Sequence, residues 1–147
     1  MILNLTARDK KAAIREMLGL LVEQGKLDEE TMKKAEKAVQ KRESQASTGI
    51  GKWLGVPHAK SCSFVDDSLV GVYARCEGGL SYESVDGEPV HVLFLVLSSS
   101  KGADENLSIM KRIAALHRDE KSLRYLTTST DAANITEIFK EADEQFS

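Results

Sequence analysis

The sequence predicts an α/β fold, in which a small mixed β-sheet carries helices on both sides. Helical spacing of apolar residues occurs near the beginning of the chain and again over its last third, and strand patterns lie between these regions. The 147 residues, 41% of them hydrophobic, suffice for one domain with a substantial core. We found no internal repeat, linker or low-complexity segment, so we expect a single domain over residues 1–147.

Two amphipathic helices are predicted at the start of the chain. Apolar residues recur at helical spacing from Arg8 to Gln24, and Gly25 then supplies a natural stop. Asp28 is suited to cap a second helix, which we expect to extend to about Arg42. The apolar positions of these helices are Ile14, Met17, Leu18, Leu21, Val22, Met32, Ala35, Ala38 and Val39.

The middle of the chain reads as strands. Residues 62–64 and 69–76 have strand character, and a turn at Gly78-Gly79 would lead into a short return strand over 80–82. Residues 90–97 form a nearly continuous apolar run, which is typical of a strand covered on both faces at the centre of a sheet.

Helical patterns resume after a loop over residues 98–103. We expect a helix over 104–117, a short one over 121–126 and a last amphipathic one over 130–146.

Composition narrows the classes of protein. The two cysteines, Cys62 and Cys76, have no metal-site spacing, and no targeting segment precedes the first helix, so we expect a reduced, cytoplasmic protein. The apolar run Val90–Leu97 is far shorter than the roughly 20 residues that span a bilayer, so no membrane insertion is expected.

The charges are unevenly distributed along the chain. Residues 1–60 carry 12 Lys/Arg against 8 Asp/Glu, and residues 61–147 carry 8 against 15. The basic half could attract an acidic partner or a phosphate, but glutamates interleave with its lysines, which favours an ordinary solvated helix face. With few aromatic residues and an acidic total, nucleic-acid binding is not expected.

Three histidines are candidate functional residues. His91 begins the apolar strand and reads as a strand-edge residue, while His117 ends a predicted helix, where a partly charged imidazole is favourable for structural reasons alone. His58 differs, because it follows Pro57 in a glycine-rich run from Ser47 to Lys60. Glycine allows close backbone approaches and proline fixes φ, so this run would hold the imidazole rigidly.

Several chemistries do not fit the surroundings of His58. No His-x-His, His-x-x-x-His or Cys-x-x-Cys pairing is present, so no metal is expected. Nucleophilic catalysis by Cys62, with His58 as its base, would require the two side chains to face each other. They need not do so if the segment between them turns into a strand. Gly51-Lys52 is followed by Trp53, which departs from the phosphate-binding loop of nucleotide hydrolases.

The remaining chemistry is nucleophilic attack by His58 itself. A neutral imidazole is available near pH 7 and can hold a phosphoryl group as a labile phosphoramidate. Transfer needs positive or donor groups around the phosphoryl oxygens. Arg42, the hydroxyls of Ser47 and Thr48, and backbone N–H groups of the run, including those of Gly49 and Gly51, could supply them.

The residues Arg42-Glu43, Ser47-Thr48-Gly49-Ile50-Gly51 and Val56-Pro57-His58-Ala59 together resemble the active-site signature of one bacterial family. They are similar to the signature of phosphotransferase-system enzyme IIA domains of the fructose/mannitol class, which includes the nitrogen-regulatory IIA proteins. The resemblance covers essentially the whole chain. It implies a mixed sheet of about five strands with helices on both sides.

The resemblance also implies roles for these residues. His58 would accept a phosphoryl group from a small HPr-type histidine phosphocarrier protein and give it to a IIB partner, or act as a phosphorylation-dependent regulator. Arg42 matches the signature arginine near the phosphoryl group, with Ser47, Thr48, Gly49 and Gly51 in the loop beside it. No cofactor is implied.

One departure from the family concerns position 106. Members of the family usually have a second histidine there, at the start of the helix after the buried strand, whereas this chain has Asn106. An amide can donate a hydrogen bond but does not carry a proton's charge. The alternative to a phosphocarrier is therefore a non-catalytic regulatory binding module with the same fold, and the sequence names neither a sugar nor a choice between transport and regulation.

Overall fold

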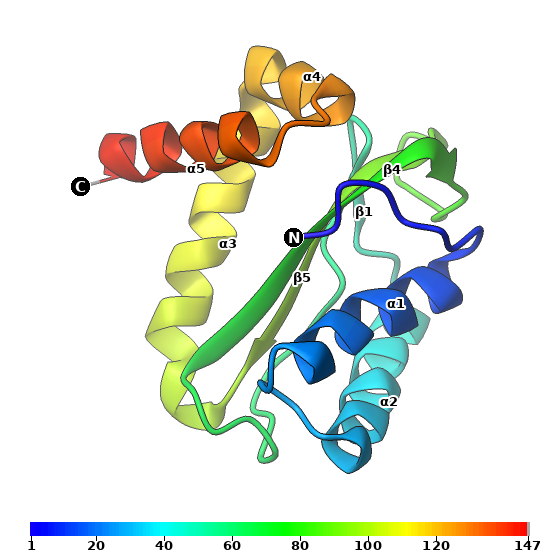
Figure 1. Ribbon diagram of the computed structural model, residues 1–147, viewed down its shortest axis with the longest axis vertical. Helices are drawn as coiled ribbons and strands as arrows, with labels where there is room; N and C mark the ends of the chain where they lie inside the picture. The colour runs from blue at the N-terminus through cyan, green and yellow to red at the C-terminus, as the bar shows by residue number, and fades with distance from the viewer. Residues whose placement is uncertain (147) are drawn as a thin grey trace.

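The sheet is organised around strand β5 (Val90–Ser98), as the computed structural model shows for residues 1–146, the part of the chain that the structure describes (Figure 1). The 12-residue strand β4 (Leu69–Leu80) pairs antiparallel with one edge of β5. Two short strands, β2 (Leu54–Gly55) and β3 (His58–Ala59), pair parallel with its other edge, and β1 (Gly49–Gly51) pairs antiparallel with β2. The predicted central position of residues 90–97 and the mixed five-stranded sheet are thus confirmed.

Helices cover both faces of this sheet. α1 (Lys10–Glu23) and α2 (Glu29–Gln45) lie on one face, and α3 (Ala103–Arg118), α4 (Glu120–Thr128) and α5 (Ala132–Phe146) lie on the other (Figure 1). A short 3₁₀ turn, Ser100–Gly102, leads into α3 where the sequence predicted only a loop. None of the described helices combines the length and apolar character needed to cross a bilayer.

The first two helices begin where their capping residues stand. Asp9 accepts a hydrogen bond from the backbone N–H of Ala12 at 2.8 Å, which starts α1 two residues later than predicted. Asp28 caps α2 as expected and accepts from the N–H of Thr31 at 2.7 Å, while the Thr31 hydroxyl accepts from the Asp28 N–H at 2.8 Å. α2 continues to Gln45, one turn beyond Arg42, and this extra turn carries Glu43 toward the core.

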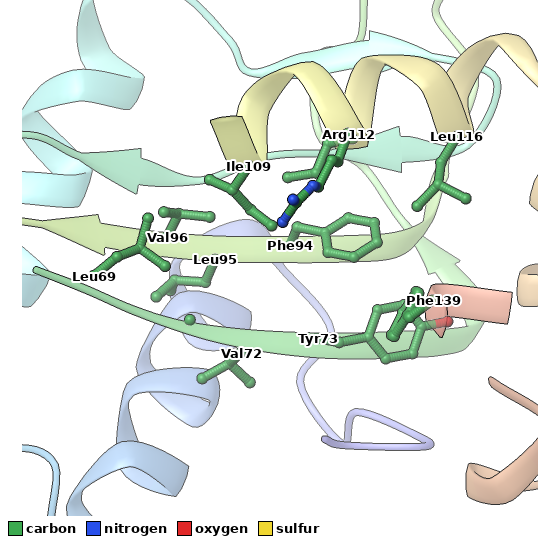
Figure 2. Close-up of a pocket in the computed structure, with 12 residues that line it drawn as sticks. Leu69, Val72, Tyr73, Phe94, Leu95, Val96, Ile109, Arg112, Leu116 and Phe139 are labelled. Atoms are coloured by element: carbon green, nitrogen blue, oxygen red, sulfur yellow. The ribbon is translucent and has the colours of Figure 1, made fainter. Parts of the chain in front are cut away.

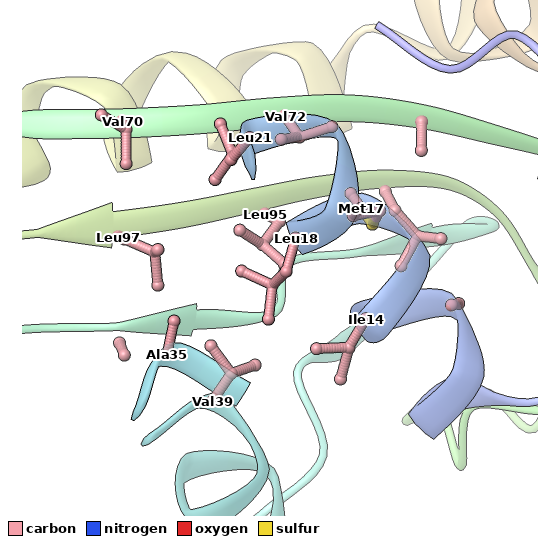
Figure 3. Packing of buried hydrophobic residues seen from close by; sticks show 14 of the residues in the cluster. Ile14, Met17, Leu18, Leu21, Ala35, Val39, Val70, Val72, Leu95 and Leu97 are labelled. Atoms are coloured by element: carbon pink, nitrogen blue, oxygen red, sulfur yellow. The ribbon is translucent and has the colours of Figure 1, made fainter. Parts of the chain in front are cut away.

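Alternation along the strands divides the core into two clusters. Leu93, Leu95 and Leu97 of β5 belong to the cluster that includes residues of α1 and α2, and Figure 3 shows Leu95 and Leu97 there. Val92 and Val96 belong to the cluster on the side of α3, α4 and α5. Each fully buried leucine contributes on the order of 2 kcal/mol of hydrophobic free energy. The first cluster also contains the apolar stripes predicted for the helices, namely Ile14, Met17, Leu18, Leu21, Ala35 and Val39.

Two strand predictions are wrong. Residues 62–64 form a turn, in which Cys62 N–H donates to the Ser98 carbonyl at 2.9 Å, because Ser61 takes a left-handed φ of 54° that ends the extended run after β3. Gly78-Gly79 is not a turn and no return strand follows over 80–82. Instead, β4 continues to Leu80. Its pairing with β5 changes register between Arg75 and Leu80, and Gly79, with φ of 79°, lies within this irregular stretch.

The glycine-rich run folds into β1, β2 and β3 rather than into a loop. These strands are two or three residues long, so no periodicity could reveal them. Pro57 separates β2 from β3, and its carbonyl accepts the N–H of Val96 at 3.0 Å, so the chain stays beside β5 across the proline. His58 therefore stands on a strand that is hydrogen-bonded to the centre of the sheet.

Candidate functional site

His58 is held in one orientation by the backbone two residues before it. Its Nδ1 lies 2.8 Å from the carbonyl oxygen of Val56. A carbonyl oxygen can only accept a hydrogen bond, so Nδ1 carries the hydrogen and Nε2 is left with the lone pair in the neutral ring. Nε2 is the nucleophilic nitrogen in this arrangement.

The imidazole opens into a hollow of ≈ 410 Å³ beside the last turns of α2. Three cationic side chains and no carboxylate line this hollow; its residues are Ala38, Lys41, Arg42, Gln45, His58, Ala59 and Lys60. Arg42 is anchored at the end of α2, because its Nη1 donates to the carbonyl of Ala46 at 2.9 Å. The structure thus brings together the predicted pair His58 and Arg42, and adds Lys41 and Lys60, which were not predicted to belong to the site.

Burial lowers the pKa of the His58 imidazole below its ordinary value of about 6.5. The charges of Arg42 and Lys60 act in the same direction, while the hydrogen bond to Val56 and the charge of Glu43 oppose them. Because the net shift is downward, the ring is neutral, and Nε2 free, over a wider range of pH than in an exposed histidine.

Glu43 organises the segment between α2 and β1. The Glu43 side chain is only 4% exposed, and its carboxylate accepts hydrogen bonds from the Thr48 hydroxyl and, at 3.0 Å, from the Tyr82 hydroxyl. Lys10 forms an ion pair with it at 3.1 Å, and the Lys10 ammonium also lies 4.3 Å from the centre of the Tyr82 ring. We refer to Lys10, Glu43, Thr48 and Tyr82 as the Glu43 network; it joins α1, α2 and the chain that leads to His58.

No role for Glu43 was predicted from the sequence. The sequence nevertheless contains a signal for a buried Glu43, because this residue follows Ala35 and Val39 at intervals of four. The structure shows that all three are buried on one side of α2. A carboxylate at the end of an apolar stripe indicates a buried polar contact.

Ser47 and Thr48 point their hydroxyls into the fold. The Ser47 hydroxyl donates to the carbonyl of Tyr82 at 2.7 Å and accepts the N–H of Gly49 at 3.1 Å. Thr48 belongs to the Glu43 network. Neither lines the hollow at His58, so in this structure both residues hold the loop rather than face the imidazole.

The two predicted glycines are close-packing positions of β1. A Cβ on Gly49 would meet the Ser84 side chain at 2.5 Å, and Gly51, with φ of 91°, faces the carboxylate of Asp86. The Gly51 carbonyl accepts a hydrogen bond from Nε2 of His117 at 3.1 Å. Gly49 and Gly51 lie outside the lining of the hollow at His58.

Asn106 lies in a second hollow, of ≈ 270 Å³, at the start of α3. The residue is 6% exposed, and its side-chain Oδ1 is buried without a hydrogen-bond partner. The hydroxyl-bearing residues Ser61, Ser98, Ser99 and Ser100 share this hollow, and Lys60 lines both it and the hollow at His58. Lys60 is therefore the residue that connects the positions of His58 and Asn106.

The other two histidines make structural contacts. Nδ1 of His91 donates to the carbonyl of Cys76 at 2.9 Å, and His117 holds β1 through Gly51. Burial raises the pKa of the Cys62 thiol, and its Sγ lies 3.8 Å from the Lys60 carbonyl, so Cys62 is poorly suited to act as a nucleophile. Among the residues whose side chains are described, His, Cys, Asp and Glu form no group of three that could hold a metal ion.

A separate apolar hollow of ≈ 280 Å³ lies between β4, β5, α3 and α5 (Figure 2). Tyr73, Phe94 and Phe139 pack at one end of it with tilted or edge-to-face rings, whose centres are 5.1 to 5.7 Å apart. It shares no residue with the hollow at His58. No nucleophile or acid–base pair among its lining residues indicates chemistry there.

A family model for the phosphoenolpyruvate-dependent sugar phosphotransferase system, EIIA 2, matches residues 1–142. The chain belongs to this family. The enzyme IIA domain is 31% identical over 141 residues to the fructose-specific EIIABC component of Bacillus subtilis, with 96% of this chain and 22% of that protein covered. It is 28% identical to a nitrogen regulatory protein of Bradyrhizobium diazoefficiens, with 91% and 84% covered.

Solved structures share the fold of this enzyme IIA domain. The nitrogen regulatory protein IIA-Ntr of Neisseria meningitidis superposes with a TM-score of 0.82 at 22% identity, covering 94% of this chain and 91% of that one. The IIA in a complex of enzyme IIAMTL with phosphorylated enzyme IIBMTL from Escherichia coli superposes with a TM-score of 0.78 at 17% identity, covering 95% and 93%. The expected family and fold are therefore confirmed.

Proposed function

We propose that this enzyme IIA domain is a phosphocarrier that accepts a phosphoryl group on Nε2 of His58. The hydrogen bond from Nδ1 to the Val56 carbonyl carries the proposal, because it fixes the tautomer that leaves Nε2 nucleophilic. Family membership supports the same reaction class.

In the proposed step the donor is a phosphohistidine of an HPr-type carrier protein. The N–P bond in the donor breaks as a new P–N bond forms at Nε2 of His58, and the donor's ring nitrogen leaves with the electron pair of its bond. Nδ1 of His58 keeps its hydrogen, so the Val56 carbonyl stabilises the positive charge that develops on the ring. Arg42 and Lys60, which line the same hollow, offset the charge of the transferred group.

The relatives support two possible fates for the phosphoryl group on His58. One structural neighbour was solved as a complex of a IIA with a phosphorylated IIB, which supports a IIB component as acceptor. Other relatives are nitrogen regulatory proteins, which support a role in which the phosphorylation state of His58 is the signal. Nitrogen regulatory proteins and sugar-specific IIA components both occur among the sequence relatives and the structural neighbours, so the proposal includes either role.

Mass spectrometry of the reaction mixture tests the proposal. The chain incubated with phosphoenolpyruvate, enzyme I and an HPr-type carrier should gain one acid-labile phosphoryl group, and His58→Ala should gain none. His91→Ala is the matched control and should be phosphorylated like the unsubstituted chain. Absence of any gain with cognate donors would rule out the carrier function.

A non-catalytic regulatory module is the second candidate, and Asn106 is the observation that favours it. Its unpartnered Oδ1 stands where the family usually has a second histidine. Under the phosphocarrier proposal, Asn106→His should raise the transfer rate to His58 by about tenfold, as an added acid–base group can. If His58→Ala and His58→Glu bind the regulatory target like the unsubstituted chain, and no phosphorylation occurs, the second candidate is the correct one.

A further inference from the structure

A further hollow, of ≈ 410 Å³, lies between the end of α4, the strands β4 and β5, and the turn that precedes β2. Two threonines of α4 line it, together with the charged and aromatic side chains of Arg75, Arg124, Glu77, His91 and Trp53. We call it the Arg75 hollow. It shares no residue with the hollow at His58, and the proposed function does not use it.

The Arg75 hollow and His58 lie at different points along β5. The carbonyl of Trp53 accepts the N–H of Val92 at 3.0 Å, whereas His58 is paired with Val96. Four residues of a β-strand span about 13 Å. The Arg75 hollow is therefore a second site and not an extension of the first.

Arg75 brings a buried positive charge to this hollow. The residue is only 3% exposed, and its Nε and Nη1 each donate at 3.0 Å, to the carbonyls of Thr127 and Leu3. A guanidinium has five N–H donors, so three remain to bind a ligand. Among the residues that the structure describes, no carboxylate forms an ion pair with Arg75. Neutral carbonyls do not cancel the charge of a buried cation, which therefore favours the binding of an anion.

The hollow also gathers positive charge from an acidic part of the sequence. Residues 61–147 carry 8 Lys/Arg against 15 Asp/Glu, yet two arginines line the hollow with a single carboxylate, that of Glu77. Arg75 belongs to β4 and Arg124 to α4, so two guanidiniums reach one space from different elements. Guanidinium groups bind phosphates and carboxylates through paired hydrogen bonds.

Trp53, the only tryptophan of the chain, brings a flat aromatic ring to the same hollow. Its backbone takes a left-handed φ of 70°, a strained conformation for a residue other than glycine. The N–H groups of His91 and Val92 hold its carbonyl at 2.8 and 3.0 Å, so β5 stabilises this conformation. The residue is half-buried and so keeps exposed surface on which a flat ring can stack.

We infer that the Arg75 hollow binds a small phosphate ester that carries a flat ring, of the nucleoside monophosphate class. The phosphate accepts hydrogen bonds from Arg75 and Arg124, and the base stacks on the indole of Trp53. Glu77 accepts hydrogen bonds from an amino group of the base or a hydroxyl of the sugar. The volume of ≈ 410 Å³ lies in the range that is usual for small-molecule sites.

Tryptophan fluorescence tests the inference directly, because Trp53 is the only source of the signal. Titration of the full chain with adenosine monophosphate or guanosine monophosphate should change this fluorescence to saturation, and calorimetry should give one site per chain. Arg124→Gln should weaken binding about tenfold through the loss of a charged hydrogen-bond donor. The matched control, Arg118→Gln, removes the same charge from an exposed position outside the hollow and should bind like the unsubstituted chain.

Fragments of the ligand separate the two contacts. Adenosine, which lacks the phosphate, and inorganic phosphate, which lacks the ring, should each bind about tenfold more weakly than adenosine monophosphate. His58→Ala should bind the nucleotide like the unsubstituted chain. Because these measurements involve no phosphoryl transfer, they test the hollow whether or not His58 is phosphorylated.

Several results would overturn the inference. One is the absence of any change in fluorescence or heat at millimolar nucleotide, and another is equal affinity of Arg124→Gln and Arg118→Gln. Inorganic phosphate that binds as tightly as the nucleotides would show an adventitious ion only. Loss of binding in His58→Ala would place the ligand in the other hollow, and binding of a single-stranded oligonucleotide without binding of mononucleotides would indicate a macromolecular partner instead.

Discussion

A single hydrogen bond determines which nitrogen of His58 is available for chemistry. Because Nδ1 donates to the Val56 carbonyl, protonation of the ring occurs at Nε2, the same atom that would accept a phosphoryl group. A proton and a phosphoryl group therefore compete for one position, and the lowered pKa of His58 favours the phosphoryl group.

This competition predicts the pH dependence of the reaction. The rate of phosphoryl acceptance should fall with decreasing pH only below about 6.5, since burial first, and then the charges of Arg42 and Lys60, hold the pKa of folded His58 under that value. Lys60→Met should raise this pKa and shift the rate profile to higher pH. NMR titration of the His58 ring, folded and in urea, measures both values.

The same shift affects stability with a definite sign. The unfolded chain binds a proton at His58 first as pH falls through about 6.5, so the folded state loses stability on the acid side. A folded pKa equal to that in urea would contradict the expectation, as would a rate profile unmoved by Lys60→Met.

Two glutamates of α2 allow a matched test of burial. Glu43→Ala should lower the free energy of unfolding by about 3 kcal/mol, because it leaves Lys10 and the hydroxyls of Thr48 and Tyr82 without their shared acceptor. Glu36→Ala removes an ion pair with Arg15, whose side chain is 57% exposed, and should have a much smaller effect. Urea denaturation of both variants measures the difference, and similar losses would show that the Glu43 network does not hold the segment.

At the scale of elements, helices were predictable and short strands were not. The caps Asp9 and Asp28 and the apolar stripes of α1 and α2 are local signals, so both helices appear close to their predicted positions. β2 and β3 have two residues each and exist because β5 offers them hydrogen bonds. A two-residue strand that forms because a neighbouring strand pairs with it is too short to show alternating apolar and polar residues in the sequence.

The turn between β1 and β2 carries backbone strain. Lys52 and Trp53 have φ of 50° and 70°, a conformation that glycine or asparagine adopts more readily. Lys52→Gly should therefore raise the free energy of unfolding by about 0.5 to 1 kcal/mol, the relief of strain exceeding the added flexibility of the unfolded chain. Lys111→Gly, within α3, is the control and should lower it by about 1 kcal/mol. Thermal unfolding compares them, and a loss of stability in Lys52→Gly would contradict the assignment of strain.

At the scale of the molecule, one close approach places α3 against the sheet. A Cβ on Gly102, just before α3, would overlap the Ser68 carbonyl oxygen and come within 2.7 Å of its carbon, at the start of β4. The N–H of Ser99 donates to the same carbonyl at 3.1 Å. Because the contact is between two backbone segments, neither can move aside without a large cost in free energy. The contact therefore fixes the position of Asn106 relative to β5.

Gly102→Ala should consequently destabilise the fold by about 2 kcal/mol or more and change the NMR signals of the Asn106 side-chain amide. Gly19→Ala provides the opposite case: it lies within α1 with open space around it, and should stabilise the protein by about 1 kcal/mol. Chemical denaturation distinguishes them. An unchanged stability and Asn106 signal in Gly102→Ala would mean that the approach of α3 to β4 is looser than the structure indicates.

The sequence by itself determined the fold class, the helices and the identity of the nucleophile candidate, since amphipathic period, capping residues and the Val56-Pro57-His58-Ala59 signature are all local. The tertiary structure decided the environment of His58. Only the packing shows that the hydroxyls of Ser47 and Thr48 point into the fold. It also shows that Glu36 and Glu43 form ion pairs with α1, and that Lys60 lines both the hollow at His58 and the hollow at Asn106. Such facts depend on which segments, distant along the chain, meet in space, and hydrogen bonds and ion pairs between them leave no periodic trace in sequence.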